Sequence, residues 1–71
     1  MEKIMLSYPG AIFTPTKNQL LVAYRNRELT LLDPETGEVK DFVKCRQALD
    51  IPTILAAARD WDAFAYTDDV V

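Results

Sequence analysis

The sequence has no histidine, one cysteine and two glycines. Without histidine, the commonest general acid–base group is missing, and serine–histidine or cysteine–histidine catalytic pairs cannot form within one chain. A lone thiol makes no intrachain disulfide and no zinc site of the usual nitrogen and sulfur kind. Two isolated glycines form neither a phosphate-binding loop nor a dinucleotide fingerprint. We therefore expect a protein that is not an enzyme and has no cofactor, no metal and no small-molecule substrate.

Long apolar runs and a strong charge bias are also missing. No run approaches the about 18 consecutive apolar residues of a membrane span, and the start MEKIMLSYPG has too short an apolar run for a signal peptide. The net charge of −3 is mild and lacks the basic balance of most dedicated nucleic-acid binders. With one free thiol and no export signal, we expect a cytoplasmic protein that does not bind membranes.

The chain length sets a narrow margin of stability. The 71 residues permit one domain, spanning residues 1–71. A chain of this size buries only about 60% of its unfolded surface. Because disulfides and zinc are excluded, a well-packed core or self-association has to supply the stability. The hydrophobic fraction of 49% is typical of a globular domain.

The first part of the chain predicts short strands. Residues 3–7 and 11–13 are expected to be extended, with Tyr8-Pro9-Gly10 as a turn between them. Pro15 puts the second piece at a sheet edge or a strand end, because proline cannot donate to a ladder. Residues 19–25 alternate Leu20, Val22 and Tyr24 on one face, as a half-buried strand does.

Two turn signals then predict a meander. Asn26-Arg27 is a two-residue hairpin turn, although arginine is unfavourable in its second position. Residues 28–33 form the next strand, and DPETG is a strong signal for a four-residue loop over residues 34–37. This loop pairs Asp33 with Glu38 and leads into a further strand, in which Leu32 pairs with Val39, Leu31 with Lys40 and Leu29 with Phe42.

The two faces of this meander predict two different environments. A core face carries Leu20, Val22, Tyr24, Leu29, Leu31 and Phe42. The opposite face also carries large aliphatic residues, Leu21, Leu32, Val39 and Val43. Antiparallel sheets with one solvated side alternate more strictly. We therefore expect this second face to be covered by a terminal segment, a second copy or a partner. A register slip of one residue would exchange the two faces.

Helical spacing replaces strand alternation after Val43. Residues 45–49 are expected to form one helical turn, and Asp50-Ile51-Pro52 reads as the start of a longer helix. We expect that helix to reach about Asp62, with a strand over residues 62–67 as the competing interpretation. The fold class is therefore α+β: a small antiparallel β-meander of three or more strands packed on one C-terminal helix.

The C-terminal stretch combines acidic and aromatic residues and has no base after Arg59. Acids around aromatic anchors suit docking onto a basic partner surface. In the simpler interpretation, Trp61 belongs to the core and the aspartates form its solvated side. Together with the second sheet face, this stretch supplies the predicted partner-binding residues: Leu21, Leu32, Val39, Val43, Trp61, Asp62, Asp68 and Asp69.

These patterns predict a small non-catalytic protein–protein interaction module that acts as an adaptor, inhibitor or regulatory subunit. Its partner is another protein or a second copy in a homodimer. The alternative is a small nucleic-acid-binding regulator using the basic residues of the central strands, Arg25, Arg27, Lys40, Lys44 and Arg46. A third hypothesis makes Cys45, between two cationic neighbours, a reactive thiol, although free cysteines are more often buried.

Overall fold

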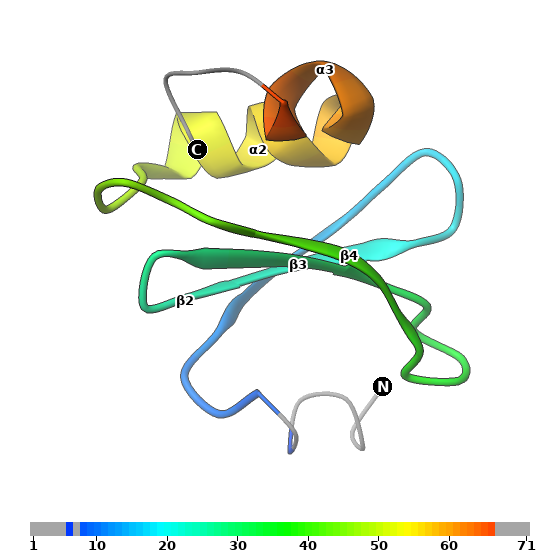
Figure 1. The fold of residues 1–71 in the computed structure, drawn as a ribbon. Helices are drawn as coiled ribbons and strands as arrows, with labels where there is room; N and C mark the ends of the chain where they lie inside the picture. The colour runs from blue at the N-terminus through cyan, green and yellow to red at the C-terminus, as the bar shows by residue number, and fades with distance from the viewer. Residues whose placement is uncertain (1–5, 7, 67–71) are drawn as a thin grey trace.

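The computed structural model describes residues 6 and 8–66, which form a four-stranded sheet followed by two helices. The strands are β1 (Ile12–Pro15), β2 (Leu21–Arg25), β3 (Glu28–Leu32) and β4 (Val39–Lys44), antiparallel and in sequence order. The helices α2 (Ile51–Arg59) and α3 (Trp61–Ala65) lie over one face of the sheet, and the N-terminal segment lies below the other (Figure 1). The α+β fold is confirmed, with a second short helix. The strand expected over residues 3–7 falls outside the described residues, apart from Leu6.

The first hairpin follows its sequence signals. Asn26 and Arg27 both adopt positive φ, 51° and 63°, as the central residues of a two-residue hairpin turn do. Arg25 pairs with Glu28 directly across the turn. Pro15 ends the outer strand β1, where its missing N–H interrupts no central ladder.

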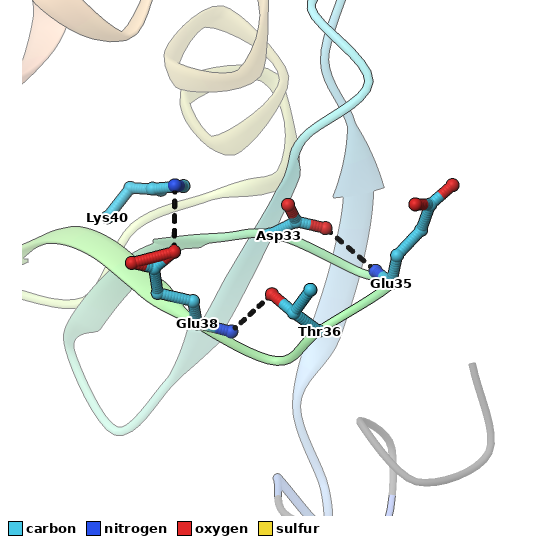
Figure 2. Close-up of polar contacts among 5 residues, drawn as sticks. All are labelled: Asp33, Glu35, Thr36, Glu38 and Lys40. Atoms are coloured by element: carbon cyan, nitrogen blue, oxygen red, sulfur yellow. Dashed lines mark hydrogen bonds and ion pairs between the residues drawn. The ribbon is translucent and has the colours of Figure 1, made fainter.

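The second hairpin turn is built around Asp33, as Figure 2 shows. The Asp33 backbone N–H donates to the Glu38 carbonyl at 2.9 Å, and the Asp33 carboxylate accepts from the Glu35 N–H at 2.8 Å. The Thr36 hydroxyl accepts from the Glu38 N–H at 3.2 Å. Gly37 supplies the positive φ of 78° at the exit. The expected pairing of Asp33 with Glu38 is confirmed.

A β-bulge then shifts the register of β4. Leu32 pairs with Val39 as the sequence predicts, but Leu31 pairs with Asp41 instead of Lys40. Lys40 is therefore the extra residue on β4. Beyond a bulge of this kind, every following side chain lies on the opposite face from the one that an unbroken ladder gives.

The bulge decides which residues of β4 enter the core. Phe42 was expected on the core face, and this expectation is wrong: Phe42 is 57% exposed on the other face. Val43, expected on the second face, packs instead into the core beneath the helices. The exchange follows from the single inserted residue, which the alternation pattern does not reveal.

The larger core lies between the sheet and the helices. Its buried members come from three strands, both helices and the segment after β4: Val22, Leu29, Leu31, Val43, Cys45, Ile54, Ala57, Ala58, Trp61 and Ala65. The two alanines of α2 lack long side chains, so the helix backbone lies close to the sheet. Full burial of a side chain such as Leu29 or Ile54 stabilises the fold by about 1.5–3 kcal/mol.

A smaller apolar cluster closes part of the second face. Leu21, Ala23 and Leu32 are buried there, and Tyr8, Ala11 and Phe13 pack against them. The N-terminal segment is thus one of the expected covers of this face (Figure 1). Leu32 is completely buried by this arrangement.

Aspartates cap both helices. The Asp50 carboxylate accepts from the Thr53 N–H at 3.0 Å at the start of α2. Asp60 is non-helical, with φ −151° and ψ 87°, and it ends α2 while its carboxylate accepts from the Ala63 N–H at 3.2 Å. The continuous helix expected to Asp62 is therefore broken at Asp60. The competing strand over residues 62–67 is wrong, because α3 runs to Ala65; Thr67 lies outside the described residues.

The segment between β4 and α2 is not helical, which corrects the helical turn expected over residues 45–49. Tertiary hydrogen bonds take the place of a helical ladder. The Cys45 N–H donates to the Arg27 carbonyl at 2.7 Å, and the Leu49 N–H donates to the Tyr24 hydroxyl at 2.9 Å. These bonds tie both ends of the segment to the first hairpin.

Candidate functional site

The predicted partner-binding residues separate into buried and exposed groups. Leu21 and Leu32 are buried under the N-terminal segment, and Val43 is buried beneath the helices. Val39 is 47% exposed and stays on the second face. Asp68 and Asp69 lie outside the described residues.

The outer strand β4 carries the exposed apolar side chains of the second face. Val39 and Phe42 belong to this strand, and their cross-strand neighbours Leu32 and Thr30 are buried. Neither Val39 nor Phe42 joins the cluster that packs under Tyr8 and its neighbours. An exposed phenylalanine on an outer strand is the residue that sequence reasoning missed, because the bulge that exposes it has no clear sequence signature.

On the other side of the same strand, Asp41 joins β4 to α3. Its carboxylate accepts from the Trp61 indole N–H at 2.9 Å and from the Phe42 backbone N–H at 2.8 Å. The Tyr66 hydroxyl donates to the same carboxylate at 3.4 Å. Trp61 is buried in the core, so the simpler interpretation of this tryptophan is confirmed.

Tyr66 and Asp62 extend this contact onto the surface. Tyr66 is 73% exposed, and Asp62 is exposed on α3. The Asp41 charge is the main cause that raises the pKa of Tyr66, with smaller contributions from desolvation, the Asp41 hydrogen bond and the Asp62 charge. Two carboxylates and an aromatic ring therefore lie together where α3 meets β4. We name Val39, Asp41, Phe42, Asp62 and Tyr66 the β4–α3 surface. It runs around the outer edge of β4: Val39 and Phe42 lie on the second sheet face, and the other three lie on the helix side.

Acidic neighbours interrupt the basic residues of the central strands. Lys40 pairs with Glu38 at 2.9 Å (Figure 2), and this hydrogen bond and charge raise the pKa of Lys40. Glu28 lies directly opposite both Arg25 and Lys44 in the ladder.

The remaining basic candidates lie at the ends of the strands. Arg27 is in the first hairpin turn, and Arg46 is exposed after β4. The Arg25 guanidinium donates to the Pro9 carbonyl at 3.3 Å. The five basic residues are therefore spread over a turn, two strands and a connecting segment.

Cys45 is buried in the larger core. Burial raises the pKa of its thiol above the ordinary value of 9.0, because the thiolate would lose its hydration. The nucleophilic form is therefore disfavoured at neutral pH. Within the described part of the chain, no three acidic, cysteine or histidine side chains come together as a metal-binding group.

Similarity to known proteins does not assign the site. Comparison of the chain with protein-family models, with curated proteins and with solved structures found no match. Among the described residues, no helix has both the length and the apolar character needed to span a bilayer.

Proposed function

We propose that this protein is a small non-catalytic protein–protein interaction module whose partner binds the β4–α3 surface. The observation that carries the proposal is Phe42, a large aromatic side chain that is 57% exposed on an outer strand beside Val39. Buried aromatic anchors contribute a large share of the binding free energy in protein interfaces. The protein acts as an adaptor, inhibitor or regulatory subunit by occupying the partner's surface.

The charge of the surface supports a basic partner. Asp41 and Asp62 lie beside the exposed Tyr66 ring, and complementary charge raises the association rate and selects the partner. In a two-fold homodimer this acidic patch would meet an equally acidic patch, which offers its carboxylates no basic partner. We therefore favour a different protein over a second copy of this chain as the partner.

The proposed partner contacts the side chains of β4 and does not pair with its backbone. Strand addition requires an open row of N–H and C=O groups, and natural outer strands are often protected against it. In β4 the bulge at Lys40 breaks the regular row. The Asp41 carboxylate also occupies the Phe42 N–H. A partner is therefore expected to bury Phe42 and Val39 without extending the sheet.

The test compares Phe42→Ser with Leu55→Ser, which changes an aliphatic side chain of similar exposure on α2. Partners are captured by crosslinking in source cells, quantified by mass spectrometry, and then titrated as purified proteins. Phe42→Ser should weaken binding more than about tenfold, as truncation of an interface anchor does. Leu55→Ser should leave this partner bound.

Light scattering behind a sizing column, at low and high protein concentration, tests the homodimer. A mass of two chains that Phe42→Ser reduces to one would identify the second copy as the partner. If Phe42→Ser changes neither the captured proteins nor the mass, the β4–α3 surface is not the binding site.

A nucleic-acid-binding role is the second candidate. The observation in its favour is that Arg25 and Lys44 share a sheet face with Phe42, whose exposed ring is placed to stack on a base. Glu28 between the two cations opposes it. Fluorescence anisotropy with a single-stranded oligonucleotide tests this candidate. Binding that falls steeply with salt and is lost in Arg25→Ala with Arg27→Ala would favour it, and a flat salt response would count against it.

A further inference from the structure

A groove lies at the other edge of the sheet, between β1 and α2. Its main hollow has a volume of about 420 Å³ and is lined by residues that include Pro15, Lys17, Leu55, Ala58 and Arg59. A smaller hollow of about 130 Å³ shares Lys17, Ala58 and Arg59 with it. The two hollows therefore adjoin each other, and we call them together the groove; they lie at the opposite edge of the sheet from β4.

Exposed aliphatic side chains lie on both elements that border this groove. Leu55 is 46% exposed in its wall, and Ile51, one helical turn earlier on the same side of α2, is 52% exposed. Ile12 is exposed on β1 and pairs with Tyr24, whose hydroxyl holds Leu49 just before α2. β1 and α2 are in contact with each other. Clusters of exposed apolar side chains are common at binding sites, and Leu55 places one such side chain in the wall of the groove.

The C-terminal end of the groove is basic. Lys17 and Arg59 line both hollows, and none of the lining residues of the main hollow is acidic. Asp60 lines the smaller hollow, where its carboxylate caps α3 by accepting from the Ala63 N–H. Among the described residues, no ion pair involves Lys17 or Arg59. Lys17 and Arg59 thus form a basic site within the groove, although the net charge of the protein is −3.

Within the described residues, no strand pairs with the outer edge of β1, whose end borders the groove. The Thr16 N–H donates to the Leu20 carbonyl at 2.9 Å, so Thr16 directs its backbone groups toward β2. Backbone direction alternates along an antiparallel strand, so Thr14 also points inward and Phe13 and Pro15 point outward. Phe13 can hydrogen-bond to an added strand through both its backbone N–H and its C=O. Pro15 can do so only through its C=O, because proline has no N–H.

We propose that the groove between β1 and α2 binds an extended, acidic–apolar peptide segment of a partner protein. The segment lies beside β1, places an apolar side chain against Leu55 and Ala58, and places an aspartate or glutamate between Lys17 and Arg59. This mode combines strand addition at a sheet edge with a side-chain pocket, and guanidinium–carboxylate pairing gives it directionality. The inference does not rest on the β4–α3 surface, whose charge has the opposite sign.

The probe is a fluorescein-labelled eight-residue peptide of alternating valine and glutamate, with acetylated and amidated ends. It is titrated against the full chain by fluorescence anisotropy, and the binding site is located by amide chemical-shift changes in the ¹⁵N-labelled protein. Binding should perturb residues 12–17 and 51–59. Lys17→Gln with Arg59→Gln should weaken binding about tenfold, the combined effect of two exposed charge pairs. Leu55→Ser should also weaken it.

Matched controls separate this proposal from the previous one. Phe42→Ser and Arg25→Gln should leave peptide binding unchanged, because both lie outside the groove. A peptide with glutamine in place of glutamate should bind about tenfold more weakly, for the same loss of charge pairing. Equal binding of the glutamine peptide, or shifts confined to β4 and α3, would overturn the proposal.

Two further outcomes would reassign the ligand. If only a peptide with a free carboxyl end binds, the groove takes a chain terminus and the acidic segment is excluded. If a single-stranded oligonucleotide displaces the peptide and binds more tightly, the ligand is a nucleic acid.

Discussion

Asp41 is the residue that couples the sheet to the last helix. One carboxylate accepts from the Trp61 indole, the Phe42 backbone and the Tyr66 hydroxyl. A half-buried carboxylate that accepts from several donors contributes more to the free energy of folding than a solvated one. If it is removed, each donor loses a charged hydrogen-bond acceptor. Asp41 is also part of the β4–α3 surface, so an experiment has to separate its structural role from its proposed role in binding.

Asp41→Asn should lower the free energy of unfolding by about 1–2 kcal/mol, because the amide has only one acceptor oxygen. Either the Phe42 N–H, or the Trp61 and Tyr66 donors, then face an NH2 group and lose their acceptor. Urea denaturation followed by Trp61 fluorescence measures the change. Asp62→Asn is the matched control on α3, and it should stay within about 0.5 kcal/mol of the wild type. Equal effects of the two variants would mean that the contact of Asp41 with Trp61 adds no stability.

At the scale of elements, aspartate caps decide where the helices begin and end. Asp50 starts α2 by accepting from both the N–H and the hydroxyl of Thr53. Asp60 ends the same helix and starts α3. An N-cap acceptor satisfies a backbone donor that has no partner within the helix. Short helices such as these depend on their caps, since isolated helices of this length are marginal.

The Asp50 cap should make stability depend on pH in the acid range. Hydrogen bonds from Thr53 lower the pKa of Asp50 below 3.8 in the folded protein. A lowered folded pKa stabilises the fold above pH 3.8, and this contribution is lost as the pH falls through the folded value. Asp50→Ala should lower the melting temperature at pH 7 by about 5 °C. Circular dichroism from pH 7 to pH 2 should show the advantage of the wild type shrinking toward the acid end.

Asp50→Ser separates the cap from the charge. Serine accepts the same backbone hydrogen bond and does not titrate, so its advantage over the alanine variant should be independent of pH. A constant gap between wild type and Asp50→Ala down to pH 2 would contradict the assigned cause.

At the scale of the whole molecule, one face of the sheet is covered by helices and the other face is covered in part. The helices cover one face, and the N-terminal segment packs on Leu21, Ala23 and Leu32 on the other (Figure 1). A chain of 71 residues has little surface to bury, so a second apolar cluster contributes a sizeable part of the total stability. The groove and the β4–α3 surface lie at the two edges that these layers leave open.

Leu32→Ala should lower the free energy of unfolding by about 2–5 kcal/mol, because the cavity would lie in a fully packed layer. This is a large share of the about 5–15 kcal/mol typical of a whole domain. Val39→Ala is the matched control, since Val39 faces Leu32 across the ladder and is exposed. It should change stability by less than about 0.5 kcal/mol in the same urea titration. A small effect of Leu32→Ala would show that the N-terminal cover is dispensable.

Local sequence signals are sufficient to determine much of the fold without reference to tertiary contacts. The Asn26-Arg27 and Asp33–Gly37 turns, the alternation in β2 and β3, and the start of α2 at Asp50 all follow from short stretches of sequence. Each depends on φ preferences, side-chain period or capping within a few residues. These features predict a meander followed by a helix, which the structure confirms.

Tertiary structure alone decided which side chains are available for binding. The Lys40 bulge moves Phe42 out of the core and Val43 into it, and the N-terminal segment removes Leu21 and Leu32 from the surface. Lys17 and Arg59 are far apart in sequence and meet only because α2 packs beside β1. The physical reason is that hydrophobic burial is not directional. The sequence predicts that an apolar side chain is buried. The packing of the layers determines on which face of the sheet it is buried.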